Sequence, residues 1–132
     1  PFPLRGGKHI LNLGTAGGMT KASTGFTFVN VQRHTRAVAA CLKDKGHPFS
    51  KLPACRKRYH FYDAILLDVL TRNRYPGSSI FRNMFLKNKP ENVFDFLGEE
   101  SHLGQELRLF TSFPQMPFIR GFLSVALQRL KP

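Results

Sequence analysis

Residues 10–28, ILNLGTAGGMTKASTGFTF, decide how the rest of the chain is interpreted. An apolar run over residues 10–13 stops at Gly14, and a loop rich in glycine and hydroxyl side chains leads to a helical pattern that starts near Gly25. Glycines let backbone N–H groups approach a ligand closely, and a helix start offers unpaired N–H donors and the positive end of the helix dipole. The order strand, glycine loop, helix therefore predicts a site for an anionic ligand.

The loop sequence GTAGG lacks the two best-known phosphate-binding patterns. It is not the dinucleotide pattern G-x-G-x-x-G, and no Gly-Lys-Ser/Thr closes it as in a P-loop. We therefore expect an accessory segment of a cofactor site rather than the main cradle for a pyrophosphate. The alternative is an ordinary tight loop without a ligand.

Charge is distributed unevenly along the chain of 132 residues. There are 20 Lys and Arg against 8 Asp and Glu, and within residues 1–60 the single acid is Asp44. Such a basic half indicates an anionic neighbour, which can be nucleic acid, a phosphate-bearing cofactor or a lipid surface, or else a solvated face. The basic residues are not interleaved with aromatic residues as in single-strand or helix-turn-helix binders, so we expect no nucleic-acid partner.

Length and cysteine content indicate which kind of protein the chain belongs to. The chain is long enough for one domain with a core, and no apolar run reaches the ~18 residues of a membrane span. Cys41 and Cys55 show no metal-ligand spacing, and neither do the five histidines. We therefore expect no metal site and no disulfide scaffold, and a reducing compartment.

Apolar periodicity predicts one strand and six helices. The strand covers about residues 8–13, and the helices about 25–44, 59–73, 80–87, 90–97, 102–111 and 116–130. Ser23 or Thr24 is the expected N-cap of the first helix, and Ser101 that of the fifth. A single strand needs a partner, so we expect the chain to be the C-terminal part of a larger α/β protein whose sheet lies upstream.

The string GTAGGMTKASTGFTF, followed by VQRHTRAV, resembles the C-terminal flavin-contacting segment of bacterial-type lycopene cyclases. That segment typically reads G-T-A-G-G-x-x-K-P-S-T-G-Y-x-F before a Q-R-H helix, and this chain departs from it at Ala22 and Phe26. The resemblance continues through RYHFYDAILLDVL, SSIFRNMFLKNKPENVFDFLGEES and FTSFPQMPFIRGFL, so that it covers nearly the whole chain.

The resemblance implies an α/β fold within a larger, two-domain, Rossmann-like FAD-binding flavoprotein, with this chain itself mostly α-helical with one strand. Residues 1–45 would be the C-terminal strand, loop and helix of the FAD-binding domain, and residues 46–132 a helical C-terminal region. The implied cofactor is FAD in its reduced form, with NAD(P)H as reductant. The implied cofactor-binding residues are Gly14, Thr15, Ala16, Gly17, Gly18, Ser23, Thr24 and Gly25.

The implied activity is that of a lycopene β-cyclase, an isomerase (intramolecular lyase) of carotenoid biosynthesis that closes the linear ends of lycopene into β-ionone rings by acid/base chemistry without net redox change. We expect the chain alone to be inactive. Glu99 and Glu100 are weak catalytic candidates, because FLGEES is similar to an F-L-E-E-T motif of plant cyclases. That motif precedes the flavin segment, whereas Glu99 and Glu100 follow it, so we expect them at a solvated helix end and the catalytic acid upstream.

A long hydrocarbon substrate resides in the bilayer, so the resemblance implies lycopene or a related linear carotenoid as partner and a peripheral position on the cytoplasmic face of the membrane. Residues 56–58, Arg-Lys-Arg, are the predicted contact with anionic lipid, unless they form a solvated loop. The last helix, with Phe118 and Phe122, is expected to pack in the core, and an interfacial position is its alternative. Other functions left open are an FAD-dependent isoprenoid reductase or hydroxylase and a non-enzymatic basic module that binds anionic lipid or nucleic acid.

Overall fold

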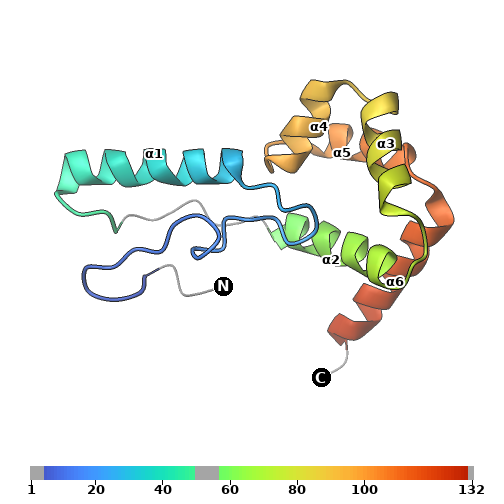
Figure 1. Cartoon of the computed structure of the whole chain (residues 1–132), viewed down its shortest axis with the longest axis horizontal. Helices are drawn as coiled ribbons and strands as arrows, with labels where there is room; N and C mark the ends of the chain where they lie inside the picture. Colours follow the sequence, from blue (N-terminus) through green and yellow to red (C-terminus); the bar gives the residue numbers. More distant parts are fainter. Residues whose placement is uncertain (1–4, 50–56, 131–132) are drawn as a thin grey trace. The chain divides into compact units, whose positions relative to one another are not determined.

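The computed structural model describes residues 5–49 and 57–130 and divides the chain into two compact units, residues 1–55 and 56–132. The first unit holds α1 (Phe28–Lys45), preceded by the glycine loop (Figure 1). The described part of the second unit holds α2 (Lys57–Thr71), α3 (Gly77–Lys87), α4 (Pro90–Leu97), α5 (Leu103–Thr111) and α6 (Gln115–Leu130).

The predicted helices are confirmed, with small shifts at their ends, because local end signals agree with the fold. Gly46 adopts the left-handed conformation (φ 69°), and its N–H donates to the carbonyl of Leu42, which ends α1. Pro90 occupies the start of α4, and Glu91 lies in its first turn, where a carboxylate favours the helix dipole. None of these helices, in the part of the chain that the structure describes, is long and apolar enough to cross a membrane.

The predicted strand over residues 8–13 is wrong for the described chain. This segment forms one isolated antiparallel bridge, between Arg5 and Leu11, and no strand occurs within residues 5–49 and 57–130. A strand needs a second extended segment to exchange a ladder of backbone hydrogen bonds. The mostly helical character of the chain is therefore confirmed, while the larger flavoprotein fold and the assignment of residues 1–45 and 46–132 to its parts stay predictions.

Within the second unit, α2 and α6 form a closely packed pair (Figure 1). Gly121 permits the approach, because a Cβ there would lie 3.1 Å from Val69 Cγ2 and 3.3 Å from the carbonyl oxygen of Ile65. Near the other end of α6, the Arg129 guanidinium lies 4.8 Å from the centre of the Phe61 ring. Phe61 also meets Phe122 edge to face at 5.4 Å, so the contact between α2 and α6 extends from the start of α2 to Val69.

Aromatic side chains connect α2, α4 and α5. The Tyr62 ring stacks on Phe96 with centroids 6.1 Å apart and meets the edge of Phe110 at 5.0 Å. Phe96 and Phe110 also meet edge to face at 5.8 Å. Such pairs contribute roughly 0.5–1.5 kcal/mol each beyond the area they bury. Phe96 and Phe110 are half-buried, and their contacts with Tyr62 help to hold α2, α4 and α5 together.

Candidate functional site

The glycine loop of the first unit is a closed turn. The N–H of Met19 donates to the carbonyl of Gly14, and the N–H of Gly25 donates to the carbonyl of Lys21, each over 2.9 Å. Gly14, Gly18 and Gly25 have φ angles of 60°, 74° and 71°. Side chains of L-residues disfavour this left-handed region, so the path of the loop depends on these glycines.

Gly17 serves the loop in a different way. A Cβ at Gly17 would overlap the carbonyl oxygen of Asn12, so close backbone packing inside the loop demands glycine there. A Cβ at Gly14 or Gly25 would meet no atom within 4 Å. The space beside Gly14 and Gly25 is therefore open, whereas the space beside Gly17 is filled by the loop itself.

Three threonine hydroxyls tie the loop to the start of α1. The hydroxyl of Thr27 donates to that of Thr20 over 3.0 Å, and the hydroxyls of Thr20 and Thr15 share a hydrogen bond of 3.0 Å. One turn into the helix, Asn30 Nδ2 donates to the carbonyl of Met19 over 3.1 Å. These bonds fix the helix start beside the loop.

The start of α1 lies at Phe28, later than predicted, and the predicted caps Ser23 and Thr24 are wrong. Thr27 is the N-cap residue, its side chain makes no capping hydrogen bond, and the first turn contains no acid. The Thr24 hydroxyl instead accepts from the N–H of Phe26 over 3.3 Å. No carboxylate in the first turn of α1 therefore neutralises the positive end of its dipole.

Lys21, Asn30 and His34 are the buried polar residues in the described part of the first unit. Lys21 is 3% exposed and His34 is 2% exposed. Burial lowers the pKa of His34, because loss of hydration disfavours the imidazolium form. Neither ring nitrogen of His34 has a hydrogen-bond partner within the described chain. His34 is therefore a neutral, enclosed side chain at pH 7 rather than an accessible general base.

The donor set of this loop and helix start suits an anionic ligand. Thr15, Ala16 and Gly18 are exposed, and first-turn N–H groups of a helix have no intrahelical acceptor. The only charged side chain within the loop, residues 14–27, is cationic Lys21. All of the predicted cofactor-binding residues fall in this one loop: Gly14, Thr15, Ala16, Gly17, Gly18, Ser23, Thr24 and Gly25. A negatively charged edge of a flavin would meet donors and no opposing carboxylate there.

The two weak catalytic candidates lie in the second unit, just after α4. Glu99 is 4% exposed and has a φ of 62°, and Glu100 is exposed. The N–H of Glu99 donates to the carbonyl of Phe96, and that of Glu100 donates to the carbonyl of Asp95 over 2.8 Å. The backbone of both glutamates therefore closes the end of α4, as expected, but only Glu100 is solvated there, because Glu99 is buried.

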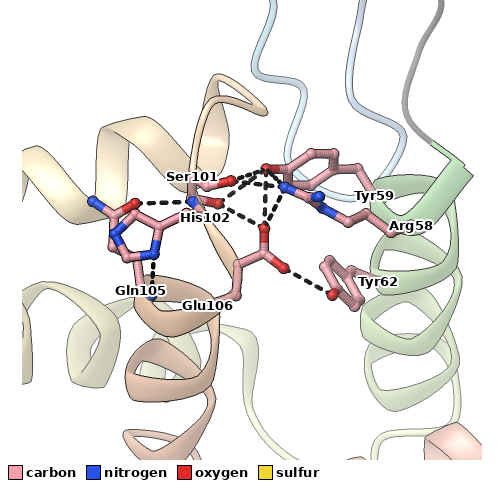
Figure 2. Close-up of polar contacts among 7 residues, drawn as sticks. All are labelled: Arg58, Tyr59, Tyr62, Ser101, His102, Gln105 and Glu106. Carbon is pink, nitrogen blue, oxygen red and sulfur yellow. Dashed lines mark hydrogen bonds and ion pairs between the residues drawn. The ribbon is translucent and has the colours of Figure 1, made fainter.

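A buried charged cluster in the second unit has no counterpart in the sequence-based predictions (Figure 2). Glu106 of α5 lies at its centre and is 1% exposed. Its Oε1 accepts from the hydroxyls of Tyr59 (3.1 Å) and Ser101 (3.0 Å) and lies 2.9 Å from Arg58 Nη2. Its Oε2 accepts from the Tyr62 hydroxyl over 2.9 Å. Donors from α2 and from the segment before α5 thus enclose one carboxylate.

Arg58 belongs to this cluster rather than to a solvated loop. Its Nη2 also donates to the carbonyl of Ser101 over 2.7 Å, and its guanidinium lies 4.8 Å from the centre of the Tyr59 ring. The hydrogen bond with the Tyr59 hydroxyl and the nearby carboxylate raise the pKa of Arg58. The predicted lipid contact over residues 56–58 thus loses Arg58, while Lys57 is exposed and Arg56 lies outside the described residues.

Tyr62 stays protonated in this cluster. Burial, and then the hydrogen bond to Glu106, raise the pKa of Tyr62 to about 12, so its hydroxyl stays a donor. His102, not the predicted Ser101, caps α5: its Nδ1 accepts from the N–H of Gln105, whose Oε1 accepts from the N–H of His102. The Ser101 hydroxyl is used by Glu106 instead. This enclosed carboxylate holds α2 and α5 together.

Metal binding receives no support within residues 5–49 and 57–130. Their side chains contain no group of three or more His, Cys, Asp or Glu that could hold a metal ion. Cys41 is buried with a free thiol, and Cys55 lies outside the described residues.

Comparison with known families gives a match that covers most of the chain. Residues 2–122 match the family model described as lycopene cyclase protein. The chain belongs to the lycopene cyclase family. No curated protein and no solved structure shows a significant match to it. Membership in this family confirms the resemblance seen in the glycine loop and the helices after it, and it indicates a carotenoid cyclase with a carotenoid substrate.

Proposed function

We propose that this chain is the C-terminal part of a flavin-dependent lycopene β-cyclase, in which loop residues 14–27 and the start of α1 hold one edge of FAD. Two observations support the proposal together. The family match indicates carotenoid cyclisation. The start of α1 has no acid in its first turn and no side-chain cap. Its backbone N–H groups and the positive end of its dipole can therefore interact with an anion.

In this proposal, N–H groups of the loop and of the first turn of α1 would hold the flavin. The chemistry supplied by bound reduced FAD, with NAD(P)H as reductant, would be a negative charge that stabilises cationic character in the carotenoid. A helix N-terminus carries roughly half a positive charge, which favours an anionic flavin over a neutral one. Open space beside Gly14 and Gly25 leaves room for such an approach.

Ring closure also needs an acid that protonates a terminal double bond of lycopene and a base that removes a proton from the ring. We assign neither role to Glu99 or Glu100, since they follow the flavin segment, whereas the similar glutamates of plant cyclases precede it. Glu106 is enclosed by four donors and is likewise unsuited. The acid then lies upstream, and the enzyme acts at the cytoplasmic face of the membrane, where its substrate is dissolved.

Conversion of lycopene by the intact enzyme tests the proposal. We expect β-carotene, with the same mass as lycopene, formed by purified enzyme only when reduced FAD is supplied. A product heavier by two hydrogens would indicate a reductase, and one heavier by an oxygen a hydroxylase. Cyclisation at full rate without flavin would refute the cofactor assignment and leave the cyclase assignment standing.

A further inference from the structure

Helix α6 carries apolar side chains on two opposite faces. One face packs against α2 through Gly121 and through Val125, which is 6% exposed. The other face, named here the α6 stripe, consists of Met116, Ile119, Leu123, Leu127 and Leu130, with exposed fractions of 64%, 48%, 53%, 61% and 79%. Spacings of three and four residues place these five side chains along one side of the helix.

The α6 stripe differs from ordinary surface exposure of apolar residues. Single exposed leucines are common on soluble proteins and need no explanation. A continuous row of five large apolar side chains along a whole helix indicates a surface that contacts a protein or a membrane. The face of α6 that carries Gly121 and Val125 packs on α2, as expected for a core helix. The α6 stripe lies on the opposite face and needs a different binding partner.

Charge around the α6 stripe favours an anionic occupant. With about 3.6 residues per turn, Arg120 falls directly beside the stripe, whereas Arg129 falls nearer the face that packs on α2, with its guanidinium over the Phe61 ring; both arginines are exposed. The sequence after Glu106 contains Arg108, Arg120, Arg129 and Lys131 and no Asp or Glu, although Lys131 lies outside the described residues.

The carboxylate that contacts α6 from α2 does not oppose this charge. Asp68 accepts a hydrogen bond of 2.9 Å from the Ser124 hydroxyl and is buried. Arg72 and Arg74 form ion pairs with Asp68 at 2.8 and 2.9 Å. Asp68 is thus neutralised on the side of α6 that faces α2, away from the stripe.

We propose that α6 lies in the plane of an anionic bilayer surface, with the α6 stripe among the acyl chains and Arg120 at the level of the headgroup phosphates. Amphipathic helices with flanking cations bind membranes in this way. The inference deepens the proposed function, because a carotenoid dissolved in the bilayer must reach its enzyme from that surface. It moves the membrane contact from residues 56–58 to α6, since Arg58 is bound to Glu106.

Sedimentation of the full chain with vesicles of phosphatidylcholine and phosphatidylglycerol tests the apolar part. The double variant Leu123→Ser and Leu127→Ser should bind at least about tenfold more weakly, because two half-exposed leucines no longer enter the acyl region. The matched control is Leu42→Ser with Leu86→Ser, which removes two exposed leucines from α1 and α3 and should bind like the wild type.

The charged part has its own test. Arg120→Gln should weaken binding to the anionic vesicles by about fivefold at low salt, and should leave binding to pure phosphatidylcholine nearly unchanged. Far-UV circular dichroism should show wild-type helix content in every variant, because these side chains lie outside the core.

Two results would overturn the inference. Equal vesicle binding by the wild type and the leucine variant would show that α6 does not enter the membrane. A wild-type dimer that becomes a monomer in the leucine variant, without any change in vesicle binding, would show that a second copy covers the stripe. Vesicle binding is measured without flavin or carotenoid, so a failure of α6 to bind vesicles would not contradict the proposed cyclase function. A failure of the intact enzyme to cyclise lycopene would likewise not contradict the membrane contact of α6.

Discussion

Replacement of Glu106 by leucine should destabilise the second unit strongly. Leucine has nearly the same size but accepts no hydrogen bond, so the carboxylate bonds from Tyr59, Tyr62 and Ser101 are lost together. Arg58, whose side chain is 33% exposed, then loses its carboxylate but can turn toward water.

The magnitude follows from what each donor can do afterwards. A hydrogen bond to a charged group contributes about 1.5–3 kcal/mol. The hydroxyls of Tyr59 and Ser101 already contact each other at 3.0 Å and can compensate in part, whereas the Tyr62 hydroxyl is bonded within the cluster to Glu106 Oε2. Removal of a buried charged partner typically costs about 3–5 kcal/mol. Since part of the cluster can reorganise, we expect about 3 kcal/mol for Glu106→Leu.

Glutamine at the same position separates charge from hydrogen bonding. Glu106→Gln keeps the acceptor at Oε1 and can donate from its amide to the Tyr62 oxygen, so it loses the charge and the acceptor of the Tyr62 O–H but keeps the other hydrogen bonds. We therefore expect a smaller loss, about 1–2 kcal/mol. The control Glu91→Leu removes an exposed glutamate from the first turn of α4 and should change stability by less than about 1 kcal/mol.

Urea unfolding followed by tyrosine fluorescence measures these differences. Tyr59, Tyr62 and Tyr75 are the only tyrosines, all lie in the second unit, and the chain has no tryptophan, so the signal reports on that unit alone. The slope of the transition should stay constant while its midpoint falls. A midpoint for Glu106→Leu equal to that of Glu91→Leu would refute the role of the cluster in stability.

Further expectations concern the loop, the buried histidine and the glutamates after α4. Gly17→Ala should open the loop to limited proteolysis, because the added carbon overlaps the carbonyl of Asn12; an unchanged cleavage pattern would contradict that packing. The lowered pKa of His34 means that the unfolded chain binds a proton more readily than the folded chain, so α1 should be fully stable above about pH 6.5 and less stable as the pH falls below that value. Hydrogen exchange of α1 should show this pH dependence, and His34→Leu should abolish the dependence. Glu99→Gln and Glu100→Gln should each keep most lycopene conversion, and a loss of ~10²-fold in folded, flavin-loaded enzyme would assign catalysis to them.

Helix positions were predictable because short-range signals coincide with the tertiary structure. Gly46 ends α1 in the left-handed conformation, and Pro90 starts α4, as their residue types require. The glycine loop is likewise recognisable from sequence, because its positive φ angles depend on Gly14, Gly18 and Gly25. The prediction of a strand over residues 8–13 failed because these residues have no partner strand in the described chain. Local sequence does not show whether a partner strand is present.

The faces that the helices bury were less predictable. In α5 the regular stripe contains Leu103 and Leu107, yet both are 67% exposed, and Glu106 and Leu109 are buried instead. Periodicity identifies an apolar stripe but not the neighbour that it meets, and a buried glutamate gives no apolar signal. The donors to Glu106 come largely from α2, so they can be identified only from the packing of α2 against α5. The hydrogen bonds among the threonine hydroxyls of the loop likewise depend on the folded path of the loop.

Phe28 offers the most direct test of the claim that the start of α1 holds the anionic edge of a flavin. Phe28 is the first residue of α1 and is 68% exposed. In the intact enzyme, Phe28→Glu places a carboxylate in a first turn that has none, which should stabilise α1 by about 0.3–1 kcal/mol and repel reduced FAD. The control variant Phe28→Gln places a side chain of nearly the same shape as glutamate there, without the charge. Measured as bound flavin per protein under reducing conditions, the account predicts that the glutamine variant retains FAD and the glutamate variant loses it while α1 stays folded. Wild-type flavin content in Phe28→Glu would contradict the claim.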